Sequence, residues 1–233
     1  MRPAPAAAAA AAERLRTEGW LSRAAPAFAA ALLARCEWRG LAPGEALTRG
    51  GDTDGGMFGV AEGWVALGAA YGPADAPAIH FATGPFWFGY NPMVAGAPRI
   101  AAVTARTAVI AAYVPRHAFE GLLAAQPEGW RPIAGLSNEL LSIALPAVAD
   151  SMIRDSRRRC AAVLLRLADR RLGGEAPVEL PLAQEDIATL ATLTRKTAGL
   201  VLRRLEREGL IALGYRSIAL RAPAALRRVV EGS

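Results

Sequence analysis

The sequence predicts an α+β protein with a β-barrel in its first half, then a long helix, then a module of helices and one hairpin. Three observations support this order. Short apolar runs punctuated by glycine fill residues 41–115, apolar residues recur at helical spacing over 128–152, and basic residues concentrate after residue 150. With 233 residues, 53% of them hydrophobic, the chain is long enough for two small domains.

The first residues have low complexity. Residues 1–16 include an alanine run, for which we expect either mobility or a helix that continues through 13–16. Apolar residues at helical spacing over 27–36 predict a short amphipathic helix. Glycine, proline or arginine interrupts the longest apolar stretches, so we expect no membrane span. No secretory signal is clear, and Cys36 and Cys160 are expected to be reduced thiols of a cytoplasmic protein.

The sequence pattern of residues 17–127 is typical of a β-barrel. Five β-type runs lie between glycines and prolines, at residues 57–60, 63–67, 78–81, 101–105 and 108–114. Many short strands separated in this way indicate an all-β sandwich or barrel. We expect Trp87, Phe88 and Tyr90 to pack in its core and turns.

Residues 128–152 predict a helix that pairs with a second copy of itself. Its apolar residues recur every three or four positions, as in a heptad seam. The predicted dimerisation residues are Ile133, Leu136, Leu140, Ile143 and Ala147. Pro146 is unfavourable inside such a helix, because proline has no backbone donor and should kink or break it.

Residues 153–233 predict a winged helix-turn-helix. After a helix over 155–171, a short helix over 184–190 leads through a tight turn to Thr194, whose hydroxyl can cap the next helix. That helix runs over 195–208 and ends at Gly209, a typical terminating glycine. Alternating residues at 210–213 and 217–220 then predict the hairpin that forms the wing.

The second helix of this unit is expected to contact DNA in the major groove. Residues 151–233 carry 16 basic and 9 acidic side chains, whereas residues 1–150 carry 11 and 12. Lys196 is the only lysine in the chain. The predicted DNA-binding residues are Thr194, Arg195, Lys196, Thr197, Gly199, Leu200 and Arg203. The alternative is a solvated basic face that mediates protein contacts.

The order of these motifs resembles the Crp/Fnr family of bacterial transcription regulators. The segment LAQEDIATLATLTRKTAGLVLRRLEREGLIAL resembles the family's C-terminal domain. The segments LAPGEALTRGGDTDGGMFGVAEGWVAL and GPFWFGYNPMVAGAPRIAAVTA resemble its cyclic-nucleotide-binding-like jelly-roll barrel. The resemblance implies a homodimer on a pseudo-palindromic operator, with double-stranded DNA, RNA polymerase and an unidentified small-molecule effector as partners and no membrane.

The resemblance also assigns roles to single residues. Arg195 corresponds to the arginine that reads a guanine in the family's recognition helix. Lys196 stands where glutamate is frequent, and Leu200 where a further arginine is frequent, so we expect a different target sequence with less hydrogen-bonded readout.

The candidate ligand residues in the barrel are Gly89, Tyr90, Arg99, Ile100 and Ala101. In cyclic-nucleotide-binding relatives a carboxylate holds the ribose and an arginine–serine pair grips the phosphate. Tyr90 does not replace that carboxylate and Ile100 brings no hydroxyl, so we expect that cyclic AMP is not the ligand. Arg99 is then a structural residue or part of another ligand's pocket.

Three classes of function remain to be compared. A sequence-specific DNA-binding regulator leads, and a ligand-binding or protein-interaction module that has lost specific DNA binding is the alternative. An enzyme is not expected, since the sequence has no glycine-rich phosphate loop and no metal-ligand cluster. Haem held by His80 or His117 is a minor alternative, and we expect no cofactor and no metal.

Overall fold

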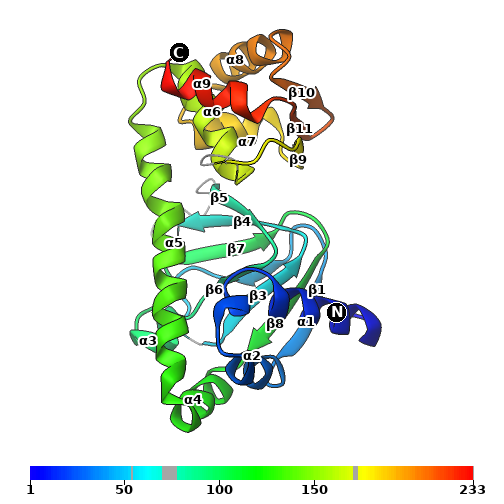
Figure 1. The fold of residues 1–233 in the computed structure, drawn as a ribbon, viewed down its shortest axis with the longest axis vertical. Coiled ribbons are helices and arrows are strands. Elements are labelled where there is room, and N and C mark those ends of the chain that lie inside the picture. Colours follow the sequence, from blue (N-terminus) through cyan, green and yellow to red (C-terminus); the bar gives the residue numbers. More distant parts are fainter. Residues whose placement is uncertain (54, 70–77, 170–172, 233) are drawn as a thin grey trace. The chain divides into compact units, whose positions relative to one another are not determined.

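The computed structural model describes residues 1–53, 55–69, 78–169 and 173–232 (Figure 1). The chain divides into two compact units. The first comprises residues 1–77 and 81–140, and the second comprises residues 78–80 and 141–233.

Two four-stranded sheets form the front of the chain. Their strands are β1 (Glu37–Leu41), β2 (Ala46–Thr48), β3 (Met57–Glu62), β4 (Trp64–Ala69), β5 (Ala78–Thr83), β6 (Phe86–Phe88), β7 (Ala101–Ala105) and β8 (Val109–Val114). One sheet has the order β1-β8-β3-β6 and the other β2-β7-β4-β5. The five predicted runs are confirmed as β3, β4, β5, β7 and β8, whereas β1, β2 and β6 were not predicted.

Helices cover one face of the first of these sheets. They are α1 (Pro5–Thr17), α2 (Pro26–Leu33), α4 (Arg116–Ala125) and the beginning of α5 (Trp130–Ser151), and the short helix α3 (Asn91–Val94) follows β6. The alanine run therefore forms a helix, the second of the two alternatives. Between helices and sheet lies the main core, which includes Leu15, Phe28, Met57, Trp87 and Leu136.

Aromatic rings occupy the other face of the same sheet. Because side chains alternate along a strand, Phe58 points away from the face to which Met57 contributes. The ring of Phe58 lies 5.6 Å from that of Phe88 and 4.8 Å from that of Tyr113. Trp87, Phe88 and Tyr90 are all buried, as expected.

Helix α5 continues through Pro146 to Ser151 without a break and has two apolar faces. Ile133 and Leu136 are buried in the core of the first unit, and Leu140 packs against that core. The prediction that Ile133 and Leu136 line a dimer seam is therefore wrong, because their own barrel already covers them. Ile143 and Ala147 follow on the same side and are half-buried.

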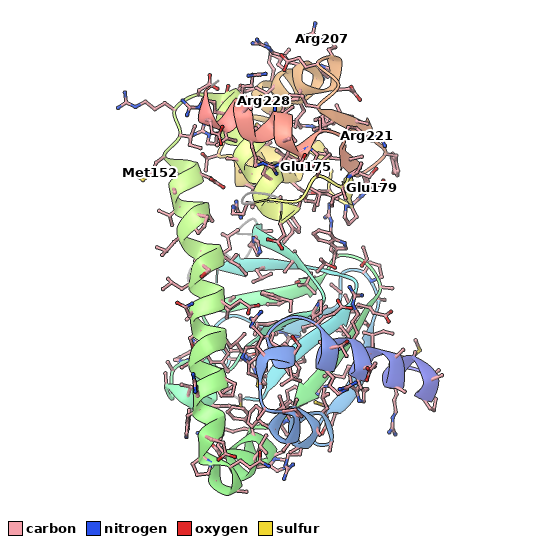
Figure 2. The ribbon with its side chains drawn as sticks, viewed as in Figure 1. Met152, Glu175, Glu179, Arg207, Arg221 and Arg228 are labelled. Carbon is pink, nitrogen blue, oxygen red and sulfur yellow. The ribbon has the colours of Figure 1, made fainter. Side chains whose placement is uncertain are left out.

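The opposite side of α5 carries exposed apolar side chains. They are Leu141, Leu145, Val148 and, just after the helix, Met152, with exposed fractions of 52% to 77%; Met152 is labelled in Figure 2. Within the described residues, Pro127–Ser151 is also the one helix long and apolar enough to cross a membrane by length and composition. We expected no helix of this kind. Length and composition alone are weak evidence for a membrane span, because a core helix of a soluble protein meets the same criteria.

The second unit contains the predicted helix-turn-helix and wing. Its elements are α6 (Ser156–Leu167), β9 (Val178–Leu180), α7 (Gln184–Leu190), α8 (Arg195–Arg207), β10 (Ile211–Gly214), β11 (Ser217–Leu220) and α9 (Pro223–Glu231). The predicted helix over 155–171 is α6, although residues 170–172 lie outside the described residues. Strand β9, which pairs with β11, and helix α9 were not predicted. Arg166 of α6 and Asp150 of α5 form a buried ion pair at 2.9 Å.

Candidate nucleic-acid interface

Helix α8 begins where the sequence predicts. The Thr194 hydroxyl accepts a hydrogen bond from the Thr197 backbone N–H at 3.2 Å, which satisfies one of the free amides of the first turn. Thr192, in the preceding turn, has a φ of 51°, and Gly209, just after the helix, has a φ of +73°. These local features set the start and the end of the helix.

The two sides of α8 differ sharply in chemistry. Ala198, Leu202 and Leu205 are fully buried and fasten the helix to its unit. The exposed side carries the residues Arg195, Lys196, Leu200, Arg203, Arg204 and Arg207; Figure 2 shows Arg207 pointing outward at the end of α8. The exposed side is therefore cationic from its first turn to its last, except at Leu200.

Gly199 lies elsewhere than predicted. It is buried rather than on the outward face. A Cβ atom built on Gly199 would lie 3.4 Å from Nη1 of Arg203, so the Arg203 side chain covers this position. The prediction that Gly199 lies on the outward face is wrong for this reason, whereas its contact with DNA stays a prediction.

Two carboxylates that sequence reasoning missed hold α8 in place. Glu206 accepts a hydrogen bond from the Leu213 backbone N–H at 2.8 Å and so joins α8 to the wing. Glu208 accepts from Arg157 Nη2 at 2.5 Å and from Arg204 Nε at 3.1 Å, which joins α8 to α6. Hydrogen bonding from Arg157, and then from Arg204, lowers the pKa of Glu208 below its ordinary value. The sequence signal that could have identified Glu206 and Glu208 is their acidic charge within or next to a strongly basic helix.

The tip of the wing was also missed as a candidate contact. Tyr215 is 94% exposed, and Arg216 has a φ of 52° in the two-residue turn between β10 and β11. This exposed tyrosine and the arginine beside it lie in the same cationic unit as α8. The tip of the wing is therefore a second candidate contact with DNA.

The candidate ligand residues of the barrel do not gather around a common space. Arg99 is only 5% exposed, and its guanidinium donates to the carbonyl oxygens of Gly89 and Gly56, each at 2.7 Å. Tyr90 is buried in the core cluster, whereas Ile100 is 57% exposed. Ala101 begins β7. Gly89 and Arg99 are therefore brought together, and Tyr90 and Ile100 point elsewhere.

The histidines lie on separate elements. His80 is on β5 and burial lowers its pKa to about 4, whereas His117 is exposed at the start of α4. In the part of the chain that the structure describes, no three His, Cys, Asp or Glu side chains gather as metal ligands do. Burial raises the pKa of the Cys36 and Cys160 thiols to about 12, so neither is a reactive thiolate near neutral pH.

Two family models match the chain. The cyclic nucleotide-binding domain matches residues 38–126, and the Crp-like helix-turn-helix domain matches residues 158–229. The first covers most of the two sheets and α4, and the second covers α6 to most of α9. A comparison with curated protein sequences finds no significant match.

Solved structures, among them those of two transcription regulators, share this fold. A transcriptional regulator of the CRP/FNR family from Thermus thermophilus is 25% identical, with a TM-score of 0.66, over 84% of this chain and 98% of that one. A CRP-family regulator from the same organism is 25% identical, with a TM-score of 0.65, over 84% and 97%. FixK2 from Bradyrhizobium japonicum is 20% identical, with a TM-score of 0.70, over 83% and 96%.

The two family models occur in the order that these regulators have, and each coincides with one part of the fold. The α+β architecture of a jelly-roll barrel, a long helix and a winged helix-turn-helix is thereby confirmed. The chain belongs to the Crp/Fnr family of transcription regulators.

Proposed function

We propose that this regulator binds DNA sequence-specifically as a cytoplasmic homodimer, through α8, on a pseudo-palindromic operator. The observation that carries the proposal is the exposed side of α8. It begins with Arg195 at a capped helix start and stays cationic to Arg207. Arginine in the first turn of a helix in the major groove can donate two hydrogen bonds to a guanine. RNA polymerase is the expected further partner, and we expect no enzymatic activity.

The exposed apolar stripe of α5 supports the dimer. We define this stripe as Leu141, Leu145, Val148 and Met152, which are spaced by four, three and four residues, as in a coiled-coil seam. A membrane span would instead be apolar on all sides, whereas α5 also carries Glu139 and Asp150. The partner that fits both the spacing and the narrow width of this stripe is a second copy of α5.

A two-fold dimer sets the geometry of the operator. Two α8 helices related by such an axis read inverted half-sites, whose centres are about 10 base pairs apart, or one helical turn of DNA. The proposal therefore predicts a palindrome rather than a single or directly repeated site.

Cyclic AMP is expected not to bind the barrel at physiological concentrations. Arg99 is already hydrogen-bonded to two backbone carbonyls, and Ile100 brings no hydroxyl to a phosphate. Each missing polar contact costs about 1–3 kcal/mol. Titration calorimetry with cyclic AMP should give no binding heat, and micromolar affinity would contradict this assignment of Arg99. The effector, for which we expect a different chemistry, stays unidentified.

Two arginine variants test the DNA-binding proposal. Arg195→Ala should reduce the preference for the operator over a scrambled duplex by about 1–3 kcal/mol and leave non-specific binding nearly unchanged. Arg203→Ala should weaken both duplexes alike and lower the slope of log affinity against log salt by about one unit, because we assign Arg203 to backbone phosphate.

The measurement is binding of both variants to operator and scrambled duplexes at several salt concentrations. An unchanged specificity ratio in Arg195→Ala would mean that α8 is not docked as proposed. Absence of any salt-dependent DNA binding by the parent protein would favour the alternative, a ligand-binding or protein-interaction module.

A further inference from the structure

One side chain on the exposed side of α8 does not fit its surroundings. Leu200 is 56% exposed, in the middle of the helix. Its neighbours one turn away on the helix surface are Lys196 and Thr197 before it, and Arg203 and Arg204 after it. The core side of the helix is already formed by Ala198, Leu202 and Leu205. Leu200 is therefore not part of the buried side that holds α8 to its own unit.

The chemistry around Leu200 limits what it can contact. An apolar protein partner would have to bury the surrounding cationic groups, which is costly without paired charges. A polyanion satisfies those groups instead, provided that it also presents one isolated apolar group to Leu200. In the major groove of DNA that group is the C5 methyl of thymine, which apolar side chains contact.

We propose that Leu200 reads the C5 methyl of a thymine in each half-site of the operator. This inference rests on the proposed function, in which α8 lies in the major groove. Leu200 is five residues after Arg195, a rise of about 7.5 Å along the helix. With about 3.4 Å per base pair along the DNA, a displacement of about 7.5 Å spans at most about two base-pair steps, so the thymine lies within that range of the guanine that Arg195 reads. Leu200 is then a specificity-determining residue that acts without a hydrogen bond.

Replacement of thymine by uracil tests this directly, since it removes only the methyl group and keeps the base pair. Bound duplexes are first selected from a random pool with the purified full-length protein. Each thymine of the selected site is then replaced by uracil in both half-sites at once. At one position the parent protein should bind about tenfold or more weakly, because burial of one methyl-sized group is worth about a fourfold effect in each half-site.

Two variants make the result specific to Leu200. Leu200→Ala should bind the thymine and uracil duplexes alike, yet should still prefer the guanine that Arg195 reads. Alanine is a strong helix former, and Leu200 is largely exposed, so α8 should stay folded. Arg207→Ala, the matched control on the same exposed side, should weaken binding but keep the thymine-to-uracil ratio of the parent.

Each other outcome overturns the inference in a recognisable way. If the parent protein binds every uracil duplex as tightly as the thymine duplex, no methyl is read. If Leu200→Ala keeps the parent's ratio, another side chain reads the methyl. If the pool yields no preferred sequence, the proposed function fails, and this inference fails with it.

Discussion

Leu145→Asp is expected to convert the proposed dimer into monomers at micromolar concentration, and to raise the dissociation constant of the dimer at least about 100-fold. Leu145 is 60% exposed in the single chain, so aspartate at this position should leave each chain folded. In the dimer, the substituted aspartate of each copy would place a carboxylate inside the apolar stripe of α5. Burial of an unpaired charge costs several kcal/mol, more than one leucine contact contributes. Light scattering over a concentration series measures the change.

The matched control for this variant is Ala144→Asp. Ala144 is exposed and precedes Leu145, but it points about 100° away around the helix. Ala144 lies at the edge of the stripe, where an aspartate can stay in water, so this variant should weaken the dimer far less than Leu145→Asp does. Leu140→Asp is a poorer test, because Leu140 packs against the core of the first unit. If Leu145→Asp dimerises like the parent, then α5 does not pair through this stripe, and association of the parent with lipid vesicles would indicate a membrane as its occupant.

Arg99→Met is expected to destabilise the first unit by about 3 kcal/mol. The variant removes two hydrogen bonds from a charged donor, and the carbonyls of Gly56 and Gly89 would lose that partner in a buried place. Methionine keeps much of the side chain's length, so the loss of packing is small. The free energy of unfolding in urea gives the difference.

Tryptophan fluorescence makes that measurement specific to the first unit. All five tryptophans lie at or before residue 130, within that unit. Arg49→Met, at an exposed arginine of the same unit, is the control and should unfold like the parent. An Arg99→Met protein with the parent's stability would mean that Arg99 serves a ligand rather than the fold.

The sequence predicted best those features that local chemistry determines. The hydroxyl of Thr194, the glycine at 209 and the alternation of the wing each act within a few residues, and α8 and the hairpin lie within about one residue of their predicted bounds. Strands β2 and β6 were missed because three residues are too few to display alternation.

Sequence patterns could not predict the features that depend on tertiary packing. Helix α5 has two apolar faces, and a period of 3.5 residues does not say which face its own barrel will cover. The same limit applies to Gly199, whose burial depends on where the Arg203 side chain lies. For Arg99, the sequence identified the position but not its partners, since Gly56 and Gly89 are distant from it along the chain.

The exposed side of α8 also has a practical consequence for experiments. Because Lys196 is the chain's one lysine, the protein carries a single ε-amine, and that amine lies on the helix we assign to DNA. An amine-reactive dye or a short cross-linker therefore marks the second unit at one known residue without any engineered cysteine. Protection of that one residue by a duplex would locate the nucleic acid on the native, unmutated protein.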